Sequence, residues 1–180
     1  KAELIVVDGL KNLLKYVSII NSLPSVKAIV MWGDPSEKEC ISQYNLEVPV
    51  YFWDDFLTLG QNISDKTVRE CYACTHPGNC ATIIYTSGTT GASKAVMISH
   101  DNFTWTARQM LSCITRKNNV PVSHEDTIIS YLPLSHVAAQ TIDLYSPMRI
   151  GGCTYFAQPD ALKGSLLQTL KEVRPTIFFG

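Results

Sequence analysis

Residues 80–99 read "CATIIYTSGTTGASKAVMIS", and this stretch decides how the fold and the function are interpreted. The apolar run over 80–85 and the second apolar run over 94–99 each predict a β-strand. Between the two runs, hydroxyl residues and glycines fill positions 86–91. Such a polar segment would not stabilise a packed core, whereas it could bind a ligand that accepts many hydrogen bonds.

The segment between the strands has the chemistry of a polyphosphate-binding loop. Glycines allow backbone N–H groups to turn toward a ligand without a Cβ atom in the way. The hydroxyls of Ser87, Thr89 and Thr90 can donate hydrogen bonds to anionic oxygens. Lys94 can neutralise a phosphate as a point charge.

This loop is not the P-loop of the Walker A type. That motif places two glycines five positions apart and follows the second at once with Lys and Ser or Thr. Here Gly88 and Gly91 are closer together, Lys94 comes three positions later, and Ala95 follows it. The flanks also predict strand, loop, strand rather than strand, loop, helix.

The rest of the chain alternates between strand-like and helix-like segments. This alternation predicts an α/β fold with mostly parallel sheets covered by helices. A polar segment over 61–79 is predicted to be a linker or loop. Strands are predicted over 3–7, 26–32, 49–53, 80–85, 94–99, 126–134, 152–157 and 176–180, and helices over 9–22, 54–61, 99–115, 136–148 and 160–173.

Composition narrows the choice of partners. The chain has 180 residues and a net charge of −1, which argues against duplex nucleic acid or an anionic membrane surface as a bulk electrostatic partner. No apolar run approaches the roughly 18 residues of a membrane-spanning helix. Both ends of the sequence fall within strand-like runs, so we expect an internal piece of a longer protein.

The six cysteines allow a second interpretation. Reduced thiols of a cytosolic protein are the simpler expectation, because the chain lacks the dense spacing of a small disulfide scaffold. Cys71, Cys74, His76 and Cys80, however, have side chains that suit zinc and lie in a polar segment. A zinc-binding module therefore remains an alternative, although no second ligand pair follows at the usual distance.

The stretch "YTSGTTGASKAVMISH" (85–100) resembles the signature of adenylate-forming enzymes, usually "YTSGTTGxPKGVMxSH". This superfamily includes acyl-CoA synthetases, luciferases and peptide-synthetase adenylation domains. The stretches "SYLPLSHVAAQ" (130–140) and 151–180 look like the bubblegum type of long-chain acyl-CoA synthetase. The resemblance implies part of the large N-terminal domain of such an enzyme. It divides the chain into a βαβ-type segment with a linker, 1–79, and an AMP-binding segment, 80–180.

The resemblance implies a fatty acid–CoA ligase that uses ATP, Mg²⁺ and coenzyme A. A fatty acid carboxylate would attack the α-phosphate of ATP, and the coenzyme A thiol would then displace AMP. No catalytic acid or base can be named, since the family's adenine-binding, Mg²⁺-binding and mobile lysine residues would lie beyond residue 180. We therefore expect this chain alone to be inactive. The implied phosphate-binding residues are Thr86, Ser87, Gly88, Thr89, Thr90, Gly91, Ala92, Ser93 and Lys94.

Three further residues can be assigned expectations. His136 matches a family histidine that lines the acyl and adenylate pocket, although a histidine at a helix start can also simply bond neighbouring backbone. Gln140 and Asp143, one helical turn apart, are expected to be solvated or capping residues.

Fatty substrates make contact with membrane surfaces reasonable, and a cytoplasmic location is expected.

Two positions depart from the family signature. Ser93 stands where the family usually has Pro, and Ala95 stands where it usually has Gly. If position 95 requires a positive φ or a close approach of the backbone, the Ala95 methyl group would be unfavourable, and with Ser93 it would weaken ATP binding or turnover. A non-catalytic ATP-binding protein of the same fold is therefore the main alternative to an active ligase.

Overall fold

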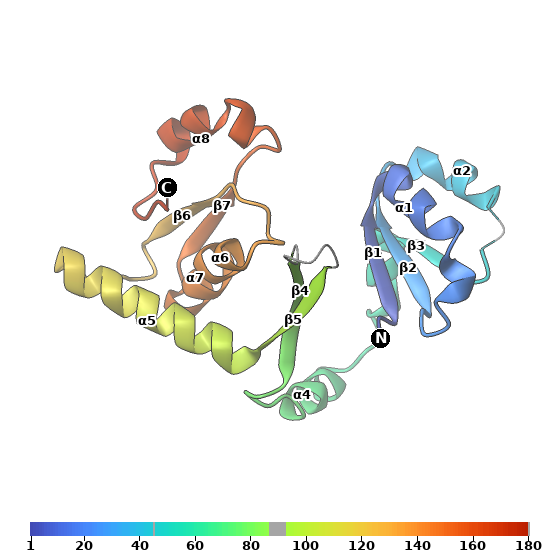
Figure 1. Ribbon diagram of the computed structural model, residues 1–180, viewed down its shortest axis with the longest axis horizontal. Coiled ribbons are helices and arrows are strands. Elements are labelled where there is room, and N and C mark those ends of the chain that lie inside the picture. The colour runs from blue at the N-terminus through green and yellow to red at the C-terminus, as the bar shows by residue number, and fades with distance from the viewer. Residues whose placement is uncertain (45, 87–92, 180) are drawn as a thin grey trace. The chain divides into compact units, whose positions relative to one another are not determined.

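The computed structural model describes residues 1–44, 46–86 and 93–179. The chain divides into two compact units, Lys1–Tyr72 and Ala73–Gly180, which are described separately. Figure 1 shows the elements of each unit along the chain, coloured from blue to red.

The first unit is built on a three-stranded parallel sheet with the order β1-β2-β3. Helix α1 packs against β1 and β2, and α3 packs against β2 and β3. The strand, helix, strand prediction for the first thirty residues is confirmed. The elements are β1 (Leu4–Asp8), α1 (Gly9–Val17), η1 (Ile20–Ser22), β2 (Ala28–Trp32), η2 (Pro35–Glu37), α2 (Lys38–Ser42), β3 (Val50–Phe52) and α3 (Trp53–Leu59).

The first unit turns directly from strand into helix and closes around one apolar cluster. Gly9 has φ +69°, a conformation that costs glycine little, so α1 begins immediately after β1. The side chains of Leu13, Ile29 and Met31 are fully buried in the cluster. Burial of each such side chain stabilises the fold by roughly 1.5–3 kcal/mol.

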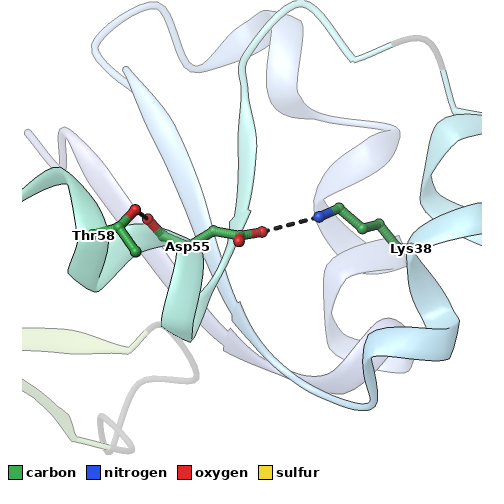
Figure 2. A network of polar contacts seen from close by, with 3 residues as sticks. All are labelled: Lys38, Asp55 and Thr58. Carbon is green, nitrogen blue, oxygen red and sulfur yellow. Dashed lines mark hydrogen bonds and ion pairs between the residues drawn. The ribbon is translucent and has the colours of Figure 1, made fainter.

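A polar contact links two helices of this unit. Figure 2 shows the Lys38 ammonium of α2, which lies 3.0 Å from the Asp55 carboxylate of α3. The Thr58 hydroxyl in turn donates to the Asp55 backbone carbonyl at 2.6 Å. The Lys38 ammonium also lies 5.7 Å from the centre of the Phe52 ring. All of these groups lie at the surface or only partly below it.

The polar segment predicted as a loop over 61–79 contains helix α4 (Asp65–Ala73), so that prediction is wrong for these residues. The Ser64 hydroxyl accepts the Thr67 backbone N–H at 3.2 Å and caps the helix start. Asp65 places a negative charge in the first turn, which the helix dipole favours. The helix has no buried residue, although Val68, Cys71 and Tyr72 have the spacing of an apolar stripe along one face.

The second unit contains an antiparallel pair, a parallel pair and several helices. Strand β4 pairs with β5, and β6 pairs in parallel with β7. A capping box between Ser99 and Asn102 starts α5, and the helix predicted over 99–115 is confirmed. The elements are β4 (Cys80–Thr86), β5 (Lys94–Ser99), α5 (His100–Asn118), β6 (Thr127–Ser130), α6 (Val137–Ala139), η3 (Gln140–Tyr145), α7 (Ser146–Ile150), β7 (Cys153–Phe156), η4 (Ala161–Lys163) and α8 (Leu166–Val173).

The helical segment from 137 to 150 contains a π-helical stretch, η3, which the sequence did not predict. Carbonyls in this stretch are bonded by hydroxyls: Ser146 Oγ donates to Thr141 O at 2.8 Å, and Thr154 Oγ1 donates to Asp143 O at 2.7 Å. The Tyr145 ring stacks on Phe103 of α5 at 4.2 Å between centroids. The π-helix is thus held from β7 and from α5.

The strand predicted over 176–180 is reduced to a single parallel bridge between Ile177 and Ile128 among the described residues. The backbone N–H groups of Thr176 and Ile177 both donate to the Thr127 carbonyl at 3.1 Å, and the Thr176 hydroxyl donates to Asp126 at 2.7 Å. The Tyr131 hydroxyl donates to the Phe179 carbonyl at 2.6 Å. In the part of the chain that the structure describes, none of the helices has the length and apolar character needed to cross a membrane.

Candidate functional site

The hairpin of β4 and β5 brings together the two ends of the predicted phosphate-binding loop. Thr86 is paired with Lys94 at the last position of the ladder, and the Thr86 hydroxyl lies 3.5 Å from the Lys94 carbonyl oxygen. Lys94 is exposed, and none of the ion pairs among the described residues involves it. Its ammonium is therefore available to an anionic ligand.

Most of the predicted phosphate-binding residues fall outside the described part of the chain. These are Ser87, Gly88, Thr89, Thr90, Gly91 and Ala92. The assignment of these residues to phosphate binding thus stays a prediction. Thr86, Ser93 and Lys94 are described, and all three are exposed at the ends of the two strands.

Ala95 occupies an ordinary strand position. It pairs with Tyr85 in β5. Among the described residues, the non-glycine residues with positive φ are Asn119 and Arg174. The concern that Ala95 would be forced into a conformation reserved for glycine is therefore wrong. Its methyl group is exposed on the hairpin.

His136 lies at the start of the helical segment that follows β6. Its Nδ1 atom accepts the backbone N–H of Ala138 at 3.1 Å and caps α6. An accepting Nδ1 places the proton of a neutral imidazole on Nε2. The Gln140 amide fastens the preceding loop by donating to the Leu134 carbonyl at 2.6 Å. His136 is thus an exposed ring with one nitrogen fixed by backbone and the other able to donate.

Asp143 is buried, so the expectation of a solvated or capping residue is wrong for it. Its side chain is 5% exposed and lies in the π-helix. Burial raises the pKa of the carboxyl above its ordinary value, and a hydrogen bond with the Ser130 hydroxyl partly opposes that rise. The only sign of this burial in the sequence is that Asp143 is the one acidic residue in the otherwise uncharged run "VAAQTIDLY".

The alternative of a zinc site finds no support in the geometry. Cys71, Cys74, His76 and Cys80 are all described and exposed. Across residues 1–44, 46–86 and 93–179, no three His, Cys, Asp or Glu side chains are grouped so that they could hold a metal ion. The His76 backbone N–H is bonded to the Asn79 amide oxygen at 2.6 Å, which is the pattern of a turn.

Comparison with known proteins identifies relatives along the whole chain. It is 45% identical over 180 residues to the long-chain-fatty-acid–CoA ligase ACSBG2 of Xenopus laevis, covering 100% of this chain and 23% of that protein. It is also 45% identical over 181 residues to the protein of the same name from Homo sapiens, covering 100% of this chain and 25% of that protein. The chain thus spans about a quarter of the length of these relatives.

Solved structures share the fold at lower identity. The A-PCP didomain of carboxylic acid reductase from Segniliparus rugosus, in complex with AMP, matches with a TM-score of 0.64 and 21% identity over 97% of this chain and 24% of that one. The α/β class with parallel sheets and helices is thereby confirmed. The family model described as "AMP-binding enzyme" matches residues 48–180. Since this match covers more than half of its length, the chain belongs to the AMP-binding enzyme family.

Proposed function

We propose that this chain carries the phosphate-binding hairpin of an enzyme that activates long-chain fatty acids with ATP and joins them to coenzyme A. The observation that carries the proposal is the 45% identity, over the whole chain, to relatives named long-chain-fatty-acid–CoA ligase. Since the chain spans about a quarter of their length, the proposal concerns the activity of the full-length protein.

The proposed reaction has two steps. A carboxylate oxygen of the fatty acid attacks the α-phosphorus of ATP, and the bond to the β,γ-pyrophosphate breaks. The thiolate sulfur of coenzyme A then attacks the acyl carbonyl carbon, and AMP leaves. Negative charge builds up on the leaving pyrophosphate in the first step, and fixed donors near it would lower the barrier.

The hairpin offers groups suited to that charge. The Lys94 ammonium and the Thr86 hydroxyl lie at neighbouring ends of β4 and β5. We infer that they flank the β- and γ-phosphates together with the loop residues 87–92. Mg²⁺, bound to the phosphates of ATP, would share in neutralising them. We further infer that His136, with Nε2 available as a donor, lines the pocket of the acyl adenylate.

The test is ATP–pyrophosphate exchange by the full-length protein, with and without palmitate. We expect exchange that depends on the fatty acid. Lys94→Gln should lower it by about 10²-fold, the typical loss when one transition-state charge contact is removed. Lys163→Gln, which removes another exposed lysine of the same unit, should leave exchange unchanged. Exchange in the wild type that is insensitive to Lys94→Gln would contradict the role of this residue.

The rival is a non-catalytic ATP-binding protein. It was motivated by Ser93 and Ala95, and the ordinary strand geometry of Ala95 argues against a strained backbone at that position. ATP binding by the full-length protein without any exchange in the presence of fatty acid would favour the rival. Restoration of exchange by Ser93→Pro would then identify the residue responsible.

A further inference from the structure

The turn that carries His136 lies between strand β6 and helix α6. Residues 131–136 form neither helix nor strand, and residues 133–136 are exposed. Within this turn, the His136 backbone N–H donates to the Pro133 carbonyl at 2.9 Å. Because exposed residues are held only weakly by packing, the hydrogen bonds of the turn chiefly decide where the His136 backbone lies.

Gln140 closes this turn from the helical side. Its backbone N–H donates to the His136 carbonyl at 3.2 Å, and its side-chain amide donates to the Leu134 carbonyl at 2.6 Å. A carbonyl only accepts hydrogen bonds, so the nitrogen of the amide faces Leu134. Gln140 is also the first residue of the π-helix η3. This one residue therefore ties two carbonyls of the turn to the helical segment.

The His136 ring is fixed by the same arrangement. Its Nδ1 atom accepts the Ala138 backbone N–H at 3.1 Å, which leaves Nε2 as the donor of a neutral ring. The ring is thus bonded to the helix start, whereas the His136 backbone belongs to the turn. A shift of the turn relative to the helix would therefore redirect the Nε2–H group.

The Gln140 side chain contributes little to the core of the unit. Gln140 is only partly buried, whereas the adjacent Ala139 and Thr141 are buried. A hydrogen bond near the surface adds little net stability, because water replaces the lost partner. We expect loss of the bond to Leu134 to change the position of the turn more than the stability of the unit.

We propose that Gln140 is a positioning residue for adenylate formation, which holds the turn 133–136 so that the His136 Nε2–H group points at the bound acyl group. This inference rests on the proposed function, because it needs His136 in the pocket of the acyl adenylate. A single hydrogen bond can matter in this way, since a misplacement of about 1 Å in a group that contacts the reactants can lower a rate about 100-fold.

The experiment measures kcat and KM of ATP–pyrophosphate exchange by the full-length protein with palmitate. Gln140→Met keeps the length of the side chain and removes the donor, so it should lower kcat/KM for palmitate by about tenfold or more. The KM for ATP should stay unchanged, because the phosphate contacts are proposed for the hairpin. Gln140→Glu, whose ionised carboxylate cannot donate, should show the same loss.

The matched control is Gln168→Met in helix α8. The Gln168 amide donates to the exposed Glu172 carboxylate at 2.9 Å, and neither residue is near His136 in the sequence. This variant removes a glutamine donor from the same unit and should leave exchange unchanged.

A double-mutant cycle shows whether Gln140 acts through His136. His136→Ala should lower kcat/KM for palmitate by about tenfold or more, as expected when a donor to the reacting group is lost. In the His136→Ala background, Gln140→Met should cause no further loss, because two residues that act as one unit are not additive. A general loosening of the fold would instead multiply the two losses.

The outcomes separate the two proposals. A wild-type enzyme without fatty-acid-dependent exchange would overturn the proposed function and this inference with it. An active wild type would overturn the positioning role alone if His136→Ala or Gln140→Met has no effect, if Gln140→Met impairs ATP and palmitate use equally, or if the two losses multiply. If Gln140→Met does not fold, as judged by thermal unfolding, Gln140→Glu decides in the same cycle.

Discussion

The two units of the chain use their apolar residues differently. In the first unit, β1, β2 and α1 enclose a single cluster in which Leu13 and Ile29 are fully buried. In the second unit, the hairpin leaves Tyr85 at 71% and Met97 at 73% exposure, and a cavity remains beside α5. The first unit also exposes apolar side chains such as Val6 and Trp32, so the difference lies in the hairpin, in which no residue of either strand is buried.

This difference indicates different roles for the two units. A sheet that buries one face, as β1 does with Ile5 and Val7, gains stability from packing and tolerates few changes of volume on that face. A hairpin with exposed hydroxyl, ammonium and apolar groups gains little stability from them, and its composition needs another explanation. In the second unit, the phosphate-binding role that we propose for the exposed Thr86 and Lys94 would supply that explanation.

The largest expected effect is on the stability of the first unit. Leu13→Ala should lower its free energy of unfolding by about 2–5 kcal/mol, because a fully buried leucine leaves a cavity. Met97→Ala, on the exposed hairpin, should change the second unit by less than about 0.5 kcal/mol. Urea unfolding would measure both, with Trp32 and Trp53 reporting on the first unit in a Trp105→Phe background.

Equal losses in the free energy of unfolding for Leu13→Ala and Met97→Ala would contradict the difference in packing between the units. Trp105 is the tryptophan of the second unit. Met97→Ala is therefore measured in a background that retains Trp105, so that this residue reports on the second unit. The Trp32 and Trp53 rings are stacked at 4.0 Å between centroids, so their emission should change when the first unit opens.

Local sequence patterns were sufficient to predict those helices and strands whose own residues carry the signal. The apolar runs of β1, β2, β4 and β5 were visible in the sequence, and so was the start of α5 near Ser99. The pairing of Thr86 with Lys94 follows from a hairpin whose two strands were both recognised. Helix α4 was missed although Val68, Cys71 and Tyr72 have helical spacing, because the prediction for this segment was based on its overall polar composition.

The remaining features depend on contacts between segments far apart in the sequence. Asp143 is buried because β6 and the π-helix pack together, and no local pattern reveals this. The π-helix itself is held by Thr154 from β7 and by Phe103 from α5. The cavity likewise depends on the segment 176–179, which was predicted as a strand but is joined to β6 by one bridge and by side-chain bonds of Thr176.

The second prediction concerns Asp143 and the dependence of stability on pH. Burial raises the pKa of this carboxyl in the folded state, so the folded state retains its proton more firmly than the unfolded state. Wild-type stability should therefore fall as pH rises from the ordinary value of 3.8 through the folded-state pKa, and the penalty should then stay constant.

Asp143→Asn removes this titration and keeps an oxygen that can accept from Ser130. Its stability relative to the wild type should rise over the same pH interval and level off above it. Glu125→Gln, which neutralises an exposed carboxylate before β6, is the control and should show no comparable rise. Chemical unfolding at a series of pH values measures the difference, and a flat difference for Asp143→Asn would show that the carboxyl is not penalised by burial.

The smallest expected effect is at the surface of the well-packed first unit. Lys38 and Asp55 form an ion pair at 3.0 Å, but their side chains are 67% and 54% exposed, so water screens the attraction. Lys38→Met should lower the free energy of unfolding by less than about 1 kcal/mol, including the loss of the contact with the Phe52 ring. A double-mutant cycle with Asp55→Asn isolates the pair, and its coupling should shrink in about 1 M salt, where charges are screened within roughly 3 Å.

The more loosely paired Lys66 and Glu70, at 3.9 Å, should give a still smaller coupling. A coupling between Lys38 and Asp55 as large as the effect of a buried leucine would mean that the first unit depends on its surface as much as on its core.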